Sequence, residues 1–286
     1  INKILPRPYF FKNGRLFCET VDTEQIARKF GTPLYLYSER AIVESFMEIK
    51  NVTNKWPIDI CYAVKANSTL SVLKLLGSLD SGFDVVSQGE LLRVIKSVKN
   101  PKKIVFSGVG KTDEELKVAL EANIFCINVE SVSELCLIDR IANNLHVKAP
   151  ISIRVNPDID AKTHPYIATG LKENKFGLSF SEAKNAYKLA SQLNSIKIIG
   201  IDCHIGSQIT EISPYVESTK KILNFVDSIK EFPKKNFHFD LGGGLGICYK
   251  NESPPTPQKF FTPILSTIES WASRKSISMP RVIFEL

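Results

Sequence analysis

Lys65 is the residue whose position most clearly suggests chemistry. It follows the apolar run 58–64, which is typical of a short buried strand, and small and polar residues come after it. A lysine there must reach water or have its charge compensated locally, and its neutral amine can form a Schiff base with a carbonyl. Because a solvated surface lysine is the alternative, the interpretation depends on the other strand ends.

A glycine-rich segment, residues 242–246, is a second candidate site. Successive glycines allow backbone N–H groups to converge on one anion, such as a phosphate. The spacing differs from the dinucleotide-binding fingerprint, and the segment does not open a βαβ unit. The alternative is a tight turn without a ligand.

Further polar side chains follow other apolar runs. His204 could stack on a flat ring, donate a proton or be a core histidine, and Ser207 adds a hydroxyl suited to a phosphate. Glu285 could hold a ring nitrogen protonated, or could meet solvent. Arg154 could pair with a cofactor oxygen or with an internal carboxylate such as Asp84.

An alternation of helices and strands must position these residues. From about residue 38 we predict eight short strands, at 58–64, 82–86, 103–106, 124–128, 151–155, 198–203, 237–241 and 282–285. Helical patterns separate them, and two carry N-terminal signals: Thr112 precedes an acidic turn, and Ser131 with Glu134 forms a capping-box pattern.

This alternation predicts an α/β fold, a (β/α)₈ TIM barrel, with its chemistry at the carboxyl ends of the strands. An open doubly wound sheet is the runner-up. It is disfavoured because the glycine-rich turn follows the seventh strand rather than the first.

Residues 1–37 have a different character. We predict a hairpin over 9–18 with Asn13 and Gly14 at its turn, a short helix over 23–30 and an extended piece over 33–37. We therefore expect two domains: residues 1–37 as the N-terminal β segment of a second domain, and residues 38–286 as the barrel.

Composition excludes several classes of protein. The net charge of +7 comes from scattered lysines, which predicts solvated faces rather than a nucleic-acid surface. No apolar stretch approaches the ~20 residues that span a bilayer. The six cysteines form no CxxC pair, and Cys61, Cys126 and Cys203 lie in apolar runs, which indicates a cytosolic or other reducing compartment. Histidine spacing suggests no metal site.

A Schiff-base lysine, a phosphate nest, a stackable histidine and a carboxylate for a pyridine nitrogen are the parts that seat pyridoxal 5'-phosphate. The chain also resembles the diaminopimelate decarboxylases, within the barrel-type (fold type III) pyridoxal-phosphate decarboxylases that include ornithine and arginine decarboxylases. The resemblance covers nearly all 286 residues. Its motifs are residues 62–67, 83–91, 107–112, 204–208, 242–246 and, most specific to the diaminopimelate branch, 154–177.

The resemblance implies a role for each candidate. Lys65 would be the Schiff-base lysine and His204 would stack on the ring, both as catalytic residues, while Glu285 would face the ring nitrogen. The phosphate would be held by Ser207, Gly243 and Gly244. The implied reaction is decarboxylation of meso-2,6-diaminopimelate to L-lysine and CO₂, the last step of lysine biosynthesis, by a cytoplasmic (or, in plants, plastid) homodimer with shared active sites.

One departure from the family limits this expectation. Family members usually follow the last-strand glutamate with Pro-Gly-Arg, whereas Glu285 is followed here by Leu286, the last residue. The substrate-binding arginine and the carboxyl-terminal β-domain would then lie outside this chain. We therefore expect the 286-residue chain alone to bind cofactor poorly and to decarboxylate little.

Three alternatives remain. An ornithine- or arginine-type decarboxylase would differ over residues 154–177. A non-catalytic pyridoxal-phosphate-binding barrel would leave the opening hairpin without a partner. An alanine-racemase-like enzyme is disfavoured, because such enzymes are expected to face the ring nitrogen with arginine rather than glutamate.

Overall fold

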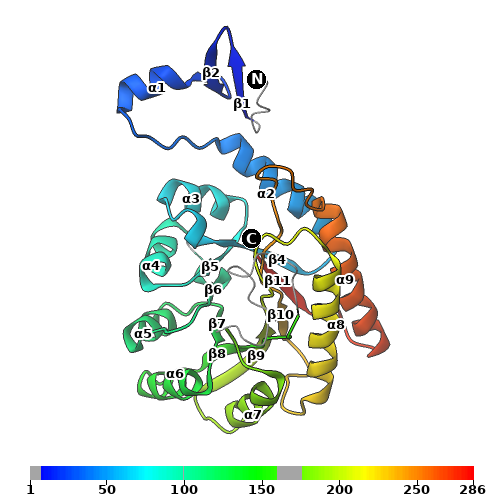
Figure 1. Cartoon of the computed structure of the whole chain (residues 1–286). Helices are drawn as coiled ribbons and strands as arrows, with labels where there is room; N and C mark the ends of the chain where they lie inside the picture. Colours follow the sequence, from blue (N-terminus) through cyan, green and yellow to red (C-terminus); the bar gives the residue numbers. More distant parts are fainter. Residues whose placement is uncertain (1–7, 99, 160–175) are drawn as a thin grey trace. The chain divides into compact units, whose positions relative to one another are not determined.

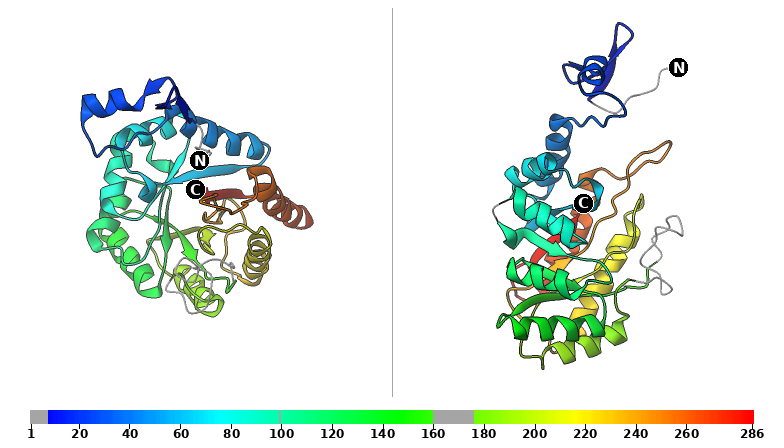
Figure 2. Two further views of the ribbon diagram at one scale, coloured as in Figure 1. Left: turned by 45° about the horizontal axis from the view of Figure 1, so that its top comes forward. Right: turned by 90° about the vertical axis from the view of Figure 1, so that its left-hand side faces the viewer.

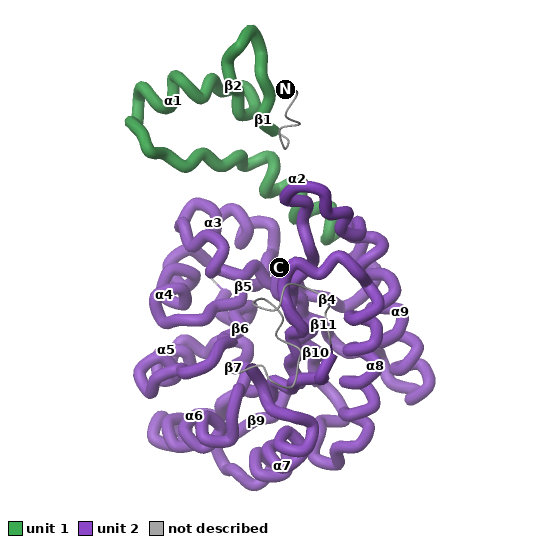
Figure 3. Tube along the Cα trace, viewed as in Figure 1, with its two compact units in different colours: residues 1–51 green, residues 52–286 purple. Residues whose placement is uncertain are grey.

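The computed structural model describes residues 8–98, 100–159 and 176–286. The chain divides into two compact units, Ile1–Asn51 and Val52–Leu286, which Figure 3 shows in two colours. Each unit is described by itself. The domain boundary expected after residue 37 stays a prediction.

The first unit holds a small antiparallel sheet. Strands β1 (Tyr9–Lys12) and β2 (Arg15–Cys18) form the predicted hairpin, and Asn13 and Gly14 at its turn have φ of 50° and 77°. A third strand, β3 (Val21–Asp22), was not predicted, and residues 33–37 form no strand. Helix α1 (Thr23–Phe30) begins at an Asp22 cap, and helix α2 (Glu39–Thr53) leads into the second unit.

The second unit is a closed barrel of eight parallel strands, which confirms the predicted fold class. The strands follow one another around the ring in chain order, and β11 closes it by pairing with β4 (Figure 1). The open doubly wound sheet is therefore excluded. The strands are β4 (Ile58–Ala63), β5 (Gly82–Val85), β6 (Ile104–Phe106), β7 (Cys126–Val129), β8 (Ala149–Arg154), β9 (Ile196–Asp202), β10 (His238–Asp240) and β11 (Arg281–Glu285).

Helices surround the strands as an outer ring (Figure 2). They are α3 (Leu70–Ser78), α4 (Gln88–Ser97), α5 (Asp113–Glu121), α6 (Val132–Asn144), α7 (Phe180–Ala190), α8 (Ser213–Ser228) and α9 (Pro257–Arg274). Helix α9 begins at Pro257 because Thr256 caps it and proline is tolerated in a first turn. Within the described residues, no helix is long and apolar enough to cross a membrane.

The two predicted helix starts differ in outcome. Thr112 and Glu115 form a reciprocal capping box. At Ser131 only half of the predicted box forms: the hydroxyl accepts from the Glu134 N–H, but the Glu134 carboxylate binds the Glu130 N–H and Lys111 instead. The prediction was wrong in this respect because a buried lysine competes for the carboxylate.

Side chains fill the barrel interior, so the two mouths of the barrel are separated from each other. Cys61, Val105, Cys126 and Ile283 form a buried cluster inside the ring. On the outside, Phe284 of β11 packs edge-to-face against Phe261 of α9 with ring centroids 4.8 Å apart. This packing fixes the strands, and with them the residues that follow each carboxyl end. The predicted burial of Cys61, Cys126 and Cys203 is confirmed.

Candidate functional site

Lys65 lies at one mouth of the barrel, beside a buried carboxylate. It belongs to a short 3-10 turn (η1, Val64–Ala66) directly after β4, and its side chain is 60% exposed. Its Nζ is 4.0 Å from Oδ2 of Asp84, a fully buried residue of β5. Burial raises the pKa of Asp84, while the charge of Lys65 opposes that rise.

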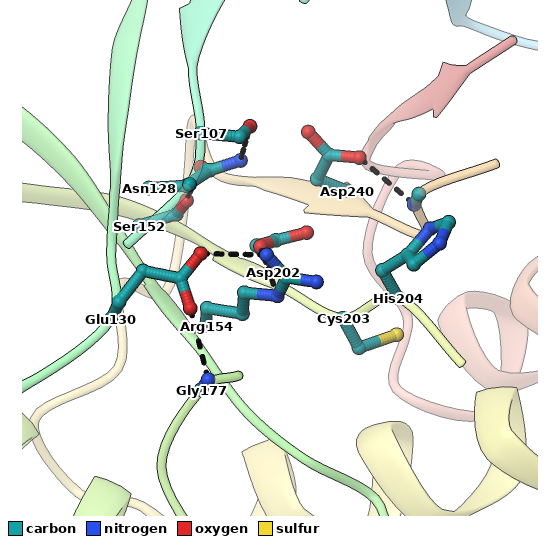
Figure 4. A network of polar contacts seen from close by, with 12 residues as sticks. Ser107, Asn128, Glu130, Ser152, Arg154, Gly177, Asp202, Cys203, His204 and Asp240 are labelled. Atoms are coloured by element: carbon teal, nitrogen blue, oxygen red, sulfur yellow. Dashed lines mark hydrogen bonds and ion pairs between the residues drawn. The ribbon is translucent and has the colours of Figure 1, made fainter. Parts of the chain in front are cut away.

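Arg154 is held by carboxylates of the neighbouring strands. Its Nη1 donates to Glu130 Oε1 at 2.6 Å, and its Nε lies 3.6 Å from Asp202 Oδ2 (Figure 4). The prediction that Arg154 could pair with an internal carboxylate is therefore confirmed. The example given, Asp84, is not its ion-pair partner. The reason is strand register: Arg154 of β8 lies opposite Asp202 of β9.

A second ion pair, between Lys111 and Glu134, helps to position Glu130. Lys111 is buried, and its Nζ donates to Glu134 at 2.7 Å and to the carbonyls of Gly108 and Asn128. The other oxygen of Glu134 accepts from the Glu130 N–H. A Glu130 carboxylate oxygen also accepts from Gly177 N–H. The loops after β6, β7 and β8 are thereby joined into one network.

Glu285 points into the same mouth. Its Oε1 accepts from Ser107 Oγ at 3.0 Å and from Asn128 Nδ2 at 3.5 Å. Asn128 in turn donates to Ser107 and accepts from Ser152, as Figure 4 shows for the labelled side chains. Glu285 is therefore turned toward the barrel axis and held there by neutral donors, and no cation bonds to its carboxyl group among the described residues.

Three carboxylates converge at this point. Oxygens of Asp202, Asp240 and Glu285 all lie within 4.8 Å of one another. Burial and mutual repulsion raise the pKa of Asp202 and of Glu285 well above their usual range. Burial, reinforced by the charge of Asp84, raises the pKa of Asp240 to about 7. The expectation that no metal binds rested on the spacing of the histidines and did not consider this carboxylate cluster. That expectation stays a prediction.

His204 is a neutral imidazole with a defined tautomer. Its Nδ1 accepts from the Gly243 N–H at 3.1 Å, so the ring proton is on Nε2. Burial, with repulsion from Arg154 and Lys65, lowers the pKa of His204 to about 3. A neutral ring held by its edge is suited to packing face-on against another flat ring.

The glycine-rich loop is shaped by close backbone approaches. A Cβ on Gly243 would lie 1.6 Å from the Glu285 carbonyl oxygen, and one on Gly244, where φ is 101°, would lie 1.9 Å from the Gly206 carbonyl oxygen. The Gly243 N–H is already donated to His204. Ser207 is exposed beside the loop. The phosphate roles of Ser207, Gly243 and Gly244 stay predictions.

Several groups in this site were missed at the sequence level. Asp202 and Asp240 each end a buried strand, which is the same signal that identified Lys65. Glu130 directly follows β7 and carries the same signal, whereas Lys111 carries none and is held by partners from neighbouring loops. Residues 160–175, most of the motif that favoured the diaminopimelate branch, lie outside the described residues.

The residues at this mouth fit a pyridoxal group. The acidic groups gathered there are Asp84, Glu130, Asp202, Asp240 and Glu285, and the cations are Lys65 and Arg154. Buried oxygens of three aspartates have no hydrogen-bond partner among the described residues, namely both of Asp84, Oδ1 of Asp202 and Oδ2 of Asp240. A protonated pyridine nitrogen beside Glu285 would offset this excess of negative charge.

Comparison with known families gives the same assignment. Residues 39–286 match the model of the pyridoxal-dependent decarboxylase, pyridoxal binding domain. The chain belongs to this family. Membership confirms the expected cofactor class, since this domain of a pyridoxal-dependent decarboxylase is the one that binds the pyridoxal.

Several relatives of this chain are diaminopimelate decarboxylases. A diaminopimelate decarboxylase of Vibrio cholerae is 48% identical over 258 residues, which are 90% of this chain and 62% of that protein. The structure of diaminopimelate decarboxylase from M. jannaschii in co-complex with L-lysine has a TM-score of 0.89 and 40% identity, covering 97% of this chain and 65% of that one. The Helicobacter pylori enzyme complexed with L-lysine has a TM-score of 0.85 and 41% identity, covering 92% and 65%.

The likeness confirms the resemblance to the diaminopimelate decarboxylases. The chain spans about three fifths of the length of the curated relatives it matches. The activity, substrate and partners of the whole protein are therefore matters of proposal.

The raised pKa of Asp240 predicts a pH-dependent stability. In the folded chain Asp240 holds its proton up to about pH 7, whereas in the unfolded chain it ionises near pH ~4. Its stabilising contribution is therefore complete below pH ~4 and is lost as the pH rises through about 7. Asp240→Asn, which is neutral throughout, should raise the free energy of unfolding of the cofactor-free chain at pH 8 by on the order of 3 kcal/mol.

Urea unfolding of the wild type and the variant at pH 5 and pH 8 measures this gain, which should shrink toward zero at the lower pH. Asp113→Asn removes an exposed carboxylate as a control and should show no pH-dependent gain. Equal destabilisation of Asp240→Asn at both pH values would contradict a raised pKa.

Proposed function

We propose that the protein to which this chain belongs removes CO₂ from meso-2,6-diaminopimelate to form L-lysine. The observation that carries the proposal is the 48% identity to a diaminopimelate decarboxylase over 90% of this chain. Two structural relatives at about 40% identity are described as complexes with L-lysine, which is the product that this reaction would release. The residues at the barrel mouth support the same chemistry.

The proposed roles follow from the contacts of each side chain. Lys65, exposed and next to Asp84, attaches the cofactor through Nζ. His204, neutral and held by Gly243, packs on the cofactor ring. Glu285, fixed by Ser107, faces the ring nitrogen and favours its protonated form. When bound, pyridoxal phosphate supplies an electron sink for the carbanion that remains after CO₂ leaves.

The other polar groups would orient these residues. We propose that Asp84 holds the Lys65 amine in place and that Arg154, fixed by Glu130 and Asp202, provides the cation nearest to the cofactor oxygens. Ser207, Gly243 and Gly244 would bind the phosphate; for Gly243 this requires exchange of the N–H bond to His204.

We further propose that residues 1–37 belong with a second β-domain and that the protein acts as a cytoplasmic homodimer with shared active sites. The small sheet of the first unit leaves large apolar side chains exposed, including Phe11 at 63%. The curated relatives are longer than this chain, which leaves room for such a domain. The cysteines are all free, in keeping with a reducing compartment.

Attachment of the cofactor to Lys65 can be tested by absorbance. The full-length protein with pyridoxal phosphate should show the visible band of lysine-bound cofactor near ~420 nm. Lys65→Ala should abolish this band, because it removes the amine that would hold the cofactor. Lys96→Ala, which removes an exposed lysine of α4, is the control and should retain it. Persistence of the band in Lys65→Ala would disprove the anchor.

Substrate choice can be tested with the full-length protein. Release of CO₂ from meso-diaminopimelate and formation of L-lysine, followed by chiral chromatography, should exceed release from ornithine or arginine by at least ~100-fold in kcat/KM. Preference for ornithine or arginine would favour the alternative decarboxylases. A Lys65-dependent band without any CO₂ release would instead indicate a cofactor-binding protein that does not decarboxylate these amino acids.

A further inference from the structure

A large cavity lies at the mouth of the barrel opposite the carboxylate site. Its volume is about 840 Å³, within the range of ~300–1,000 Å³ typical of small-molecule sites. Its lining comes from the amino-terminal ends of the strands: Phe125 precedes β7, Lys197 opens β9, and His238 and Arg281 begin β10 and β11. The buried cluster inside the barrel separates this cavity from Lys65 and Glu285.

The wall of this cavity is strongly cationic. Four lysines line it, Lys102, Lys197, Lys234 and Lys235, and its lining contains no aspartate or glutamate. None of the four has an ion-pair partner in the part of the chain that the structure describes. Burial and then repulsion by Lys197 lower the pKa of Lys102. Ammonium groups held together in this way would be stabilised by an anion between them.

The floor of the cavity is apolar and aromatic. Phe125 and Phe237 line it, and the Phe125 ring is covered by the Arg281 guanidinium 4.2 Å from its centroid. His238, 1% exposed and 5.0 Å from Phe125 between ring centroids, also lines the cavity. Its Nε2 has no hydrogen-bond partner among the described residues, which leaves a buried polar atom for a ligand. Burial and Arg281 lower the pKa of His238 to about 3, so the ring is neutral.

We propose that this cavity binds a small organic polyphosphate with a flat apolar part, of the nucleoside polyphosphate class. Lysine ammonium groups are suited to phosphate as point charges, and the flat Arg281 guanidinium that covers Phe125 is suited to stacking with a planar base. The lysines surround a concave site at the end of the barrel rather than forming an extended stripe. This shape favours a small molecule over a nucleic-acid strand.

The test is calorimetric titration of ATP, without magnesium, into the full-length protein loaded with pyridoxal phosphate. Absorbance of the bound cofactor at ~420 nm shows that the opposite mouth stays occupied throughout. We expect ATP to bind, with an affinity that falls as salt is added. Lys102→Gln/Lys197→Gln should weaken binding about tenfold or more, since each substitution removes a positive charge from the cavity wall that faces the ligand.

The matched control is Lys184→Gln/Lys188→Gln, which removes the same charge from two exposed lysines of α7 that do not line the cavity. This control should change the affinity less than ~2-fold. Inorganic tripolyphosphate should bind at least ~10-fold more weakly than ATP, because it lacks the planar part.

Three results would overturn the proposal. The first is the absence of ATP binding to the wild-type protein. The second is an equal loss of affinity in the two double variants, which would indicate unspecific attraction to a basic protein. The third is equal affinity for tripolyphosphate and ATP, which would remove the basis for the aromatic part of the ligand.

Discussion

The burial of acidic side chains at the carboxyl ends of the strands is the constraint on which this barrel mouth depends. Arg154 lies between Glu130 and Asp202, and the register places Asp240 next to Asp202 on the following strand. One arginine cannot balance this row, so carboxyl groups in it are forced toward protonation. Such an arrangement costs stability unless a bound cation completes it.

The neutral polar residues determine where that cation must sit. Ser107 and Asn128 hold Glu285 through hydrogen bonds from neutral donors, and burial keeps His204 neutral while Gly243 fixes its tautomer. The surroundings therefore favour a group that is flat, partly apolar and positively charged at one edge. A protonated pyridine ring has these properties.

The barrel fold and several residues at its mouth could be predicted from the sequence, because strands and helices alternate regularly in this fold. Apolar runs alternate with helices, and the residue after each run faces one mouth, so Lys65, His204 and Glu285 could be identified without coordinates. Ion-pair partners could not be. Arg154 meets Asp202 rather than Asp84 because of the register between β8 and β9, and no local pattern encodes that register.

Competition between polar groups explains the other differences. The capping box at Ser131 is incomplete because Lys111, buried under the loops, takes the Glu134 carboxylate. The Gly243 N–H, expected at a phosphate, is used to fix the tautomer of His204. In each case two partners compete for one polar group, and only the three-dimensional arrangement decides between them.

The central claim is that Glu285 and the surrounding carboxylates hold the cofactor ring nitrogen in its protonated form. Nitrogen NMR of the full-length protein loaded with pyridoxal phosphate, ¹⁵N-labelled in the ring, tests this directly. The account predicts the chemical shift of a protonated pyridine nitrogen in the wild type and a shift toward the neutral form in Glu285→Gln. A neutral nitrogen in the wild type, or a protonated one that Glu285→Gln leaves unchanged, would contradict it.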